Sequence, residues 1–423
     1  MLDIRLLRED PHGVLTRLRR RDPDVELDSV LSLDHERRQL ISKVQELRER
    51  RNQGSQQVAR LKAAGDHEAA TERIAGLGRL AEEIKEVERR LAAVEEELHA
   101  RLLELPNLPH DSVPVGTKEE KVLVRQWGEP PQPPPPVQNH LELARRLGLL
   151  DMERGARITG ARFPLYTGVG ARLELALIRW MFEFHVARFG YRPVLPPILA
   201  NRASFVVSGQ LPKFADELYH VPAEDLFLNP TAESLLVNLH REEILAEREL
   251  PLRYVAYTPC FRREAGSYGE EQRGLIRVHQ FNKVELFHYT TPARSYADLE
   301  ELVGHAEAVL QALGIHYRVM LLPTQDLAQQ SAKTVDLEVW LPAQGRYYEV
   351  SSCSNCEDYQ ARRGAIRYRP SGGGRPQLVH TLNGSGLATS RLLAALLEQN
   401  QRPDGSVALP PVVAELMGTA ELR

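Results

Sequence analysis

The chain has 423 residues, 42% of them hydrophobic and 26% charged, and its formal net charge is −4. This composition describes an ordinary soluble globular protein with room for two or three domains of about 100–200 residues each. The slight negative charge gives no overall sign of nucleic-acid binding, so an RNA partner would have to meet local basic patches. No apolar run of about 18 residues could span a bilayer, and the first residues lack the apolar run of a signal peptide, so we expect a cytoplasmic protein without membrane contact.

Cysteine usage agrees with a reducing compartment. The three cysteines, Cys260, Cys353 and Cys356, suggest no disulfide framework. The spacing of Cys353 and Cys356 is compatible with a redox or zinc site, but the sequence offers no second pair of ligands beside it. We therefore favour a structural role for this pair.

A long helical region extends from Leu33 to Leu102, after a short helix and a connection in residues 1–26. Gly65 and Asp66 break this region into two halves, so the simplest fold is an antiparallel helical hairpin with arms about 50 Å long. A dimerisation coiled coil or a spacer is the plainest interpretation, although the arginines could also contact a phosphate backbone. The second half carries the heptad seam of a coiled coil, formed by Leu77, Leu80, Ile84, Val87, Leu91, Val94 and Leu98.

A proline-rich segment separates the helical region from the rest of the chain. Six prolines lie between residues 130 and 136, and they follow a strand-like stretch, KVLVRQW. Such a run is extended and typical of a linker. We therefore expect an N-terminal helical domain at 1–110, a linker at 111–138 and a second domain at 139–423.

The second domain begins with two amphipathic helices, HLELARRLGLL and then ARLELALIRWMFEFHVARFG, the latter ended by Gly190. An extended segment with Pro193, Pro196 and Pro197 follows. Further on, residues 257–285 are predicted to form a β-hairpin with a charged face.

In the first strand of this hairpin Arg262 and Glu264 are two residues apart and share one side, and in the second strand Arg277, Phe281 and Glu285 do the same. Mixed charges on a hairpin often serve solubility only. This face, however, could also hold a phosphate, an amino group and a flat base.

Three further segments place polar residues at turns. Thr231, Ala232 and Glu233 precede an amphipathic helix, where Thr231 is a plausible N-cap. A hairpin turning at 343–345 ends with Glu349, Ser351 and Ser352. A glycine-rich turn with Gly384 and Gly386, which allow a close backbone approach, leads into a helix that carries Arg391. Taken one by one, each segment has an ordinary structural interpretation.

Taken together, these segments resemble the class II aminoacyl-tRNA synthetases. The stretch TPCFRREAGS…RGLIRVHQFNKVE is similar to motif 2 of the seryl-tRNA synthetases in particular. The helix and proline-containing strand before it resemble motif 1, Gly384, Gly386 and Arg391 match motif 3 (GxGxxxxR), and the TAE triplet is similar to the serine-recognition segment. The chain departs from the family at Arg263, where serine is frequent, and at residues 388–391, where AVGR is common.

The resemblance implies an α+β fold, with a class II synthetase catalytic domain whose antiparallel sheet is flanked by helices and with an N-terminal antiparallel helical-hairpin (coiled-coil) arm. It implies a homodimeric, Mg²⁺-dependent ligase that activates L-serine with ATP to seryl-adenylate and transfers serine to tRNA(Ser). It also suggests tRNA(Sec) as a substrate. The arm and the motif 2 loop, residues 265–273, would contact the tRNA.

The same resemblance assigns the site residues. The catalytic residues are Arg262 at the α-phosphate, Arg391 at the γ-phosphate and Glu264 at the adenine amine. Glu349 and Ser352 would hold Mg²⁺. The residues assigned to ATP are Arg262, Arg263, Glu264, Val278, Phe281, Glu349, Val350, Ser351, Ser352 and Arg391. Those assigned to serine are Thr231, Ala232, Glu233, Arg262, Glu285, Asn383 and Ser385. Whether Glu285 contacts the hydroxyl or the ammonium group of serine stays open.

Three other interpretations remain. An enzyme of the same fold could load an amino acid onto a carrier protein, but the complete arm favours tRNA. A non-catalytic, synthetase-like binding protein is expected to have degenerate motifs, and here motifs 2 and 3 are intact. A coiled-coil scaffold accounts for residues 33–102 and for nothing after them.

Overall fold

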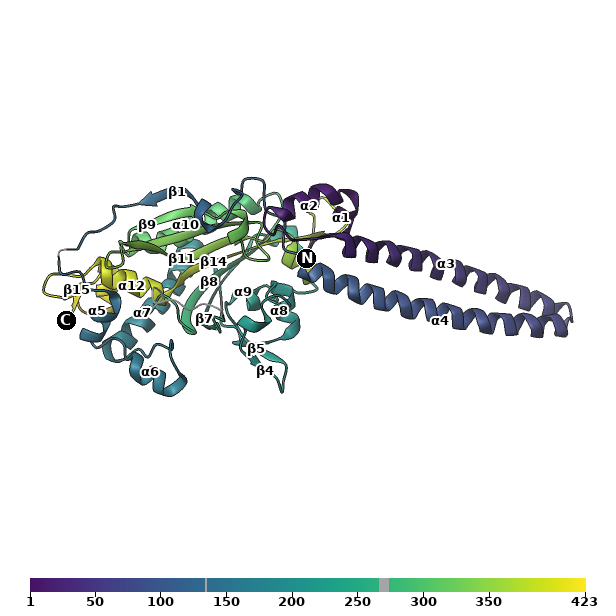
Figure 1. Ribbon diagram of the computed structural model, residues 1–423, viewed down its shortest axis with the longest axis horizontal. Coiled ribbons are helices and arrows are strands. Elements are labelled where there is room, and N and C mark those ends of the chain that lie inside the picture. Colours follow the sequence, from purple (N-terminus) through teal and green to yellow (C-terminus); the bar gives the residue numbers. More distant parts are fainter. Residues whose placement is uncertain (134, 266–273) are drawn as a thin grey trace. The chain divides into compact units, whose positions relative to one another are not determined.

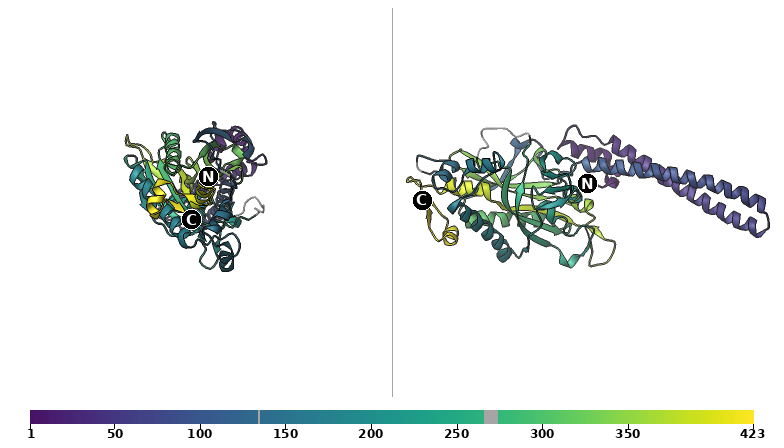
Figure 2. Two further views of the ribbon diagram at one scale, coloured as in Figure 1. Left: turned by 90° about the vertical axis from the view of Figure 1, so that its left-hand side faces the viewer. Right: turned by 90° about the horizontal axis from the view of Figure 1, so that it is seen from below.

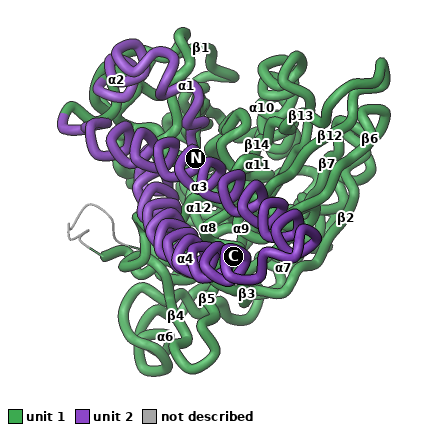
Figure 3. The backbone as a smooth tube through the Cα atoms, turned by 90° about the vertical axis from the view of Figure 1, so that its right-hand side faces the viewer, with its two compact units in different colours: residues 1, 20–23, 106–423 green, residues 2–19, 24–105 purple. Residues whose placement is uncertain are grey.

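The computed structural model describes residues 1–133, 135–265 and 274–423, which form two compact units (Figure 3). The smaller unit contains residues 2–19 and 24–105, and the larger contains residue 1, residues 20–23 and residues 106–423. The chain therefore enters the larger unit briefly at 20–23 and returns to it at 106. The domain boundaries predicted at residues 110 and 138 stay predictions.

The smaller unit is dominated by two long antiparallel helices, α3 (Asp28–Ala63) and α4 (His67–Glu104), which lie side by side (Figures 1 and 2). Two short helices precede them, α1 (Ile4–Glu9) and α2 (Pro11–Arg19). The turn between the long helices has Gly65 at φ +80°, and Asp66 caps α4 by accepting a hydrogen bond of 3.0 Å from the Ala69 amide. The predicted helical hairpin is confirmed.

An apolar seam holds the hairpin together, and its buried members include Val44, Leu47 and Val58 of α3 with Ile84, Val94 and Leu98 of α4. Gly54 lies within α3 and leaves the helix unbroken. A Cβ atom at this position would lie 2.7 Å from Leu77 Cδ2, so the glycine allows the two helices to approach each other closely.

An eight-stranded sheet, counted over the described residues, forms the centre of the larger unit (Figure 1). All neighbouring strands are antiparallel except the last pair, β7 and β2, which is parallel. The spatial order is β1 (Val122–Trp127), β9 (Tyr317–Leu321), β10 (Lys333–Leu341), β11 (Arg346–Asn355), β14 (His380–Ala388), β8 (Gln280–Thr290), β7 (Leu252–Phe261) and β2 (Arg192–Val194).

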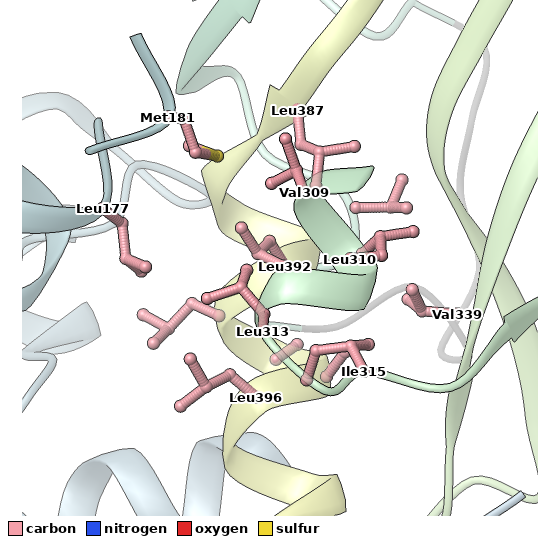
Figure 4. Close-up of a cluster of buried hydrophobic side chains, with 14 of the residues drawn as sticks. Leu177, Met181, Val309, Leu310, Leu313, Ile315, Val339, Leu387, Leu392 and Leu396 are labelled. Atoms are coloured by element: carbon pink, nitrogen blue, oxygen red, sulfur yellow. The ribbon is translucent and has the colours of Figure 1, made fainter. Parts of the chain in front are cut away.

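Three helices bury their apolar sides with this sheet: α7 (Gly168–Phe189), α10 (Ser295–Ala312) and α12 (Thr389–Gln399). Figure 4 shows part of this core, to which Leu177 and Met181 of α7 and Leu392 and Leu396 of α12 all contribute. Gly190 ends α7 in the left-handed conformation at φ +69°, as predicted. The predicted strand at 121–127 and the turn at 343–345 are also present, as β1 and as the β10–β11 connection.

The predicted charged face of the β7–β8 hairpin differs in the structure. Strand β7 ends at Phe261, so Arg262 and Glu264 lie after it, and Glu264 has a positive φ of +52°. Strand β8 begins at Gln280, so Arg277 lies before it. The alternation of a strand therefore does not place these three residues. The loop predicted at 265–273 lies, except for its first residue, outside the described residues.

The helix predicted after Glu233 is shorter than expected, since α9 covers only Glu233–Leu236. The other helices of the larger unit are α5 (His140–Arg146), α6 (Met152–Thr159), α8 (Arg202–Ser208), α11 (Tyr359–Arg363) and α13 (Pro411–Met417). The small sheets contain β3 (Leu199–Asn201), β4 (His220–Val221), β5 (Leu226–Leu228), β6 (Ile244–Ala246), β12 (Arg367–Arg369), β13 (Gln377–Leu378), β15 (Val407–Ala408) and β16 (Glu421–Leu422). Within the described ranges, the helices are all too short or too polar to cross a membrane.

Candidate active site

A cavity of about 280 Å³ opens beside the ends of β7 and β8 and the start of α12. Most of the residues assigned from the sequence line it, although they come from segments far apart in the chain. These residues are Thr231, Glu233, Arg262, Glu264, Val278, Phe281, Glu349, Val350, Ser352, Asn383, Ser385 and Arg391. The remaining four are not in its wall: Ala232 is buried in an apolar cluster, Ser351 and Glu285 are fully buried, and Arg263 is exposed.

At one end of the cavity, an arginine and an aromatic ring form a stacked pair. The guanidinium of Arg262 lies over the Phe281 ring, 5.2 Å from its centroid, and its Nε donates to the Pro230 carbonyl (3.3 Å). Glu264 forms an ion pair with Arg277. The stacked pair of Arg262 and Phe281 leaves one side of the phenyl ring and the far edge of the guanidinium free to meet a flat base and an anion.

A second arginine, Arg391, is fixed at the start of α12 by two backbone carbonyls. Its Nε donates to Ile276 (3.0 Å) and its Nη1 to Glu349 (2.7 Å), and the Glu349 carboxylate lies 3.5 Å away. The pocket walls displace water from Glu349 and so raise its pKa. The charges of Arg391 and then Arg262 more than offset this effect, and the pKa lies below its ordinary value. The carboxylate is therefore ionised at neutral pH. Solvent can still reach it, since 45% of the Glu349 side chain is accessible.

The donor set around Glu349 fits Mg²⁺. Glu349 and Ser352 offer only oxygen atoms to the cavity, as Mg²⁺ prefers. In the part of the chain that the structure describes, no three histidine, cysteine, aspartate or glutamate side chains are grouped to hold a metal by themselves. The residues thus fit an ion that takes its other ligands from water and from the phosphates of a substrate.

The other end of the cavity is a buried polar network. Glu285 accepts a hydrogen bond from the Thr231 hydroxyl (3.1 Å) and pairs with Lys283, whose ammonium also donates to Thr231 (2.7 Å). Glu233 accepts hydrogen bonds from the amides of Gln330 (2.9 Å) and Gln360 (2.6 Å). Burial, and then the charge of Glu285, raise the pKa of Glu233 to about 7.

Two cavity-lining residues of this network, Lys283 and Gln330, were not predicted from the sequence, and neither was Gln360 behind them. Lys283 lies on the same side of β8 as Phe281 and Glu285, because the three residues are spaced at intervals of two positions. This spacing could have identified Lys283 as a cavity residue. Gln330 lies in an irregular segment, and neither its spacing nor its neighbours mark it. Its contact with Glu233 depends on tertiary structure, which a single sequence does not reveal.

Comparison with known proteins identifies the family of the chain. A model described as "Seryl-tRNA synthetase N-terminal domain" matches residues 1–109, and one described as "tRNA synthetase class II core domain (G, H, P, S and T)" matches residues 217–400. A serine–tRNA ligase of Geobacillus kaustophilus is 50% identical to the chain over 424 residues, which cover 100% of each. The chain belongs to the seryl-tRNA synthetase family.

Solved structures agree with this family. A seryl-tRNA synthetase of Pyrococcus horikoshii, crystallised with ATP, is 36% identical, with a TM-score of 0.92 over 100% of this chain and 99% of the other. A cytoplasmic serine–tRNA ligase of Naegleria fowleri, in complex with AMP, is 32% identical, with a TM-score of 0.86 over 100% and 99%. The predicted class II fold and the predicted membership of the seryl-tRNA synthetases are confirmed.

Proposed function

We propose that this protein activates L-serine with ATP in the cavity described above and then transfers the seryl group to tRNA(Ser), as a serine–tRNA ligase. The observation that carries the proposal is the gathering of Arg262, Glu349 and Arg391 in one cavity of a seryl-tRNA synthetase family member. In the first step the serine carboxylate attacks the α-phosphorus of ATP and pyrophosphate leaves. The protein must therefore align two anions and neutralise the charge that develops between them.

We assign the ATP contacts along the wall from β7 to α12. Arg262 binds the α-phosphate, Arg391 binds the γ-phosphate, and Phe281 stacks on the adenine. Glu264 accepts from the exocyclic amine, and the backbone around Val278 lines the base. Supporting this arrangement, Arg262 and Arg391 are held by backbone carbonyls in orientations that leave other donors available. Arg263, Val350 and Ser351 complete the proposed ATP set.

We assign serine to the buried end of the cavity, with Arg262 reaching its carboxylate. The ammonium and hydroxyl groups of serine would meet the carboxylates and hydroxyls there, which are buried and already hydrogen-bonded. An analogue without the hydroxyl would leave buried polar groups unpaired, and such a site can reject it by about 10⁴-fold or more. The residues assigned to serine are Thr231, Ala232, Glu233, Lys283, Glu285, Asn383 and Ser385.

Glu349 and Ser352 would hold Mg²⁺, and the ion would supply charge neutralisation for the phosphates. We further propose that the helical arm and the motif 2 loop bind tRNA(Ser), that tRNA(Sec) is also charged, and that the protein acts as a homodimer in the cytoplasm. Three cysteines that are buried and free of disulfides suit that compartment.

The first test is ATP–pyrophosphate exchange with each of the twenty amino acids, followed by charging of total tRNA with the amino acid that gives exchange. Serine is expected to give exchange and to be transferred. Exchange without transfer would favour loading of a carrier protein, and no exchange at all would favour a non-catalytic binding protein.

A second test addresses the two arginines. Arg262→Ala and Arg391→Ala are each expected to lower serine-dependent exchange by at least about 10²-fold, because each removes a charged donor that acts in the transition state. Arg375→Ala, at an exposed arginine outside the cavity, is the matched control. Near-normal exchange in both variants, with the fold retained by circular dichroism, would contradict the site assignment.

A further inference from the structure

A short irregular loop, residues 327–331, forms part of the wall at the serine end of the cavity. Ala328 and Gln330 line the cavity, and the Gln330 side chain donates to Glu233. The loop lies between a short 3₁₀ turn at Thr324–Asp326 and strand β10, and it has no regular hydrogen-bond ladder of its own. Its backbone carbonyls must therefore find partners elsewhere.

Each of the five carbonyls of this loop accepts a hydrogen bond from Arg21 or Asn107, and the Ala328 carbonyl accepts a second one from the Ser331 backbone N–H (2.9 Å). Arg21 donates to Leu327 (3.0 Å), Ala328 (2.7 Å) and Ser331 (2.9 Å). Asn107 donates from its backbone N–H to the Gln329 carbonyl (2.9 Å) and from its side-chain Nδ2 to the Gln330 carbonyl (2.9 Å). The fourth hydrogen bond of the Arg21 guanidinium goes to the Asn107 carbonyl (2.7 Å), so the two residues are also bound to each other.

Arg21 and Asn107 lie at the two places where the chain passes between the compact units. Both residues belong to the larger unit, and each lies where the chain leaves or re-enters it, at 20–23 and at 106. The two ends of the helical arm are thus continuous with the residues that hold one wall of the serine pocket.

We propose that Arg21 is a positioning residue for serine: it fixes loop 327–331 so that Gln330 reaches the Glu233 carboxylate. This inference rests on the proposed function, because it takes the Glu233 end of the cavity to be the serine site. A planar guanidinium with five donors can serve four carbonyls at once, whereas a lysine ammonium has three donors and cannot match that geometry. Burial lowers the pKa of Arg21 to about 10, so the group stays charged at neutral pH.

Removal of Arg21 takes away three hydrogen bonds and leaves the Leu327 and Ser331 carbonyls without that donor, while Ala328 keeps the bond from the Ser331 N–H, and the loop is expected to relax toward water. Glu233 then loses the hydrogen bond from Gln330, while Arg262, Phe281 and Arg391 stay on other elements. The expected signature is a selective loss of serine binding, with ATP binding kept.

The experiment measures the KM values for serine and for ATP in pyrophosphate exchange with the full-length protein. Arg21→Ala is expected to raise the serine KM by about tenfold or more, Arg21→Lys by several-fold, and neither to change the ATP KM by more than about threefold. Arg20→Ala, which removes the adjacent exposed arginine side chain, is the matched control and should leave both values unchanged. A serine KM within about twofold of the unmodified protein, or an equal rise in both KM values, would overturn the proposal.

A double-mutant cycle tests whether Arg21 acts through Gln330. Gln330→Ala should raise the serine KM, and adding Arg21→Ala should change it little further, because the link is already broken. If the two substitutions raise the serine KM by factors that multiply in the double variant, Arg21 does not act through Gln330. Should Arg21→Ala fail to fold, Arg21→Lys carries the same test, since it keeps the positive charge and cannot match the four carbonyls. Absence of serine exchange in the unmodified protein would contradict the proposed function itself, whereas normal exchange with an unaffected Arg21 variant would contradict only this inference.

Discussion

Glu233 is a carboxylate whose charge is finely balanced. It is 3% exposed, and burial, followed by the nearby charge of Glu285, disfavours its ionised form. The amides of Gln330 and Gln360 and the charge of Lys283 favour that form. The outcome is a pKa of about 7, which makes the protonation of this group sensitive to pH in the working range of the protein.

This balance predicts a pH dependence of serine use. Below pH 7 Glu233 is mainly protonated and neutral, and above pH 7 it is mainly ionised and can pair with the serine ammonium group. The kcat/KM for serine is therefore expected to rise by about tenfold between about pH 6 and pH 8 and then to level off. Steady-state pyrophosphate exchange across this range, at saturating ATP, measures the effect.

Glu233→Gln is the control, because it keeps the size of the side chain and removes the titration. Its profile should lack the rise. The same rise in this variant would assign the titration to another group, and a flat profile in the unmodified protein would show that Glu233 does not control serine binding in this range.

At the scale of elements, the two glycines of motif 3 are explained by close packing. A Cβ atom at Gly384 would lie 2.8 Å from Cys353 Sγ, and one at Gly386 would lie 2.6 Å from His185 Nε2. Strand β14 thus closely approaches β11 at Gly384 and helix α7 at Gly386. His185 Nε2 lies 3.1 Å from the Gly386 carbonyl, a hydrogen-bond distance that links the motif 1 helix to the strand leading into α12.

This packing predicts that Gly386→Ala is destabilising. The added methyl group must displace a buried ring, and overpacking of this kind costs about 1–3 kcal/mol. Chemical denaturation should show this loss in the free energy of unfolding, and serine-dependent exchange should fall because Arg391 follows in the next helix. Gly372→Ala, where a Cβ atom would meet nothing within 4 Å, is the control. Equal stability of the two variants would contradict the explanation.

The elements also show which kinds of information a single sequence carries. The long helical region and its break at Gly65 and Asp66 predicted α3 and α4, and the motif wording predicted which distant residues meet in the cavity. The strand limits were not predicted, because Arg262 and Glu264 have residue types compatible with a strand, yet β7 ends at Phe261. Loop 327–331 was also missed, because its conformation depends on hydrogen bonds from residues about 200 and 300 positions earlier in the chain.

At the scale of the whole molecule, the two proposed tasks, serine activation and tRNA binding, fall on different compact units. The cavity residues all belong to the larger unit, whereas the long hairpin belongs to the smaller one. The hairpin can be shortened without touching the larger unit, because α3 and α4 are antiparallel and the start of α3 lies beside the end of α4, where Arg37 forms an ion pair with Glu95 (2.9 Å). Arg21 and Asn107 lie outside the segment 33–102 and remain in such a variant.

Replacement of residues 33–102 by a short glycine–serine linker is therefore expected to keep serine-dependent pyrophosphate exchange within about threefold, with an unchanged serine KM. Charging of tRNA should fall by at least about 10²-fold, because the proposed phosphate contacts of the arm are removed. Exchange and charging are measured on the same preparation, so loss of folding cannot imitate the result. If this variant keeps Arg21 but loses serine binding, Arg21 and Asn107 are not sufficient to hold the loop of the serine pocket. If it charges tRNA at the full rate, the arm does not bind tRNA as proposed.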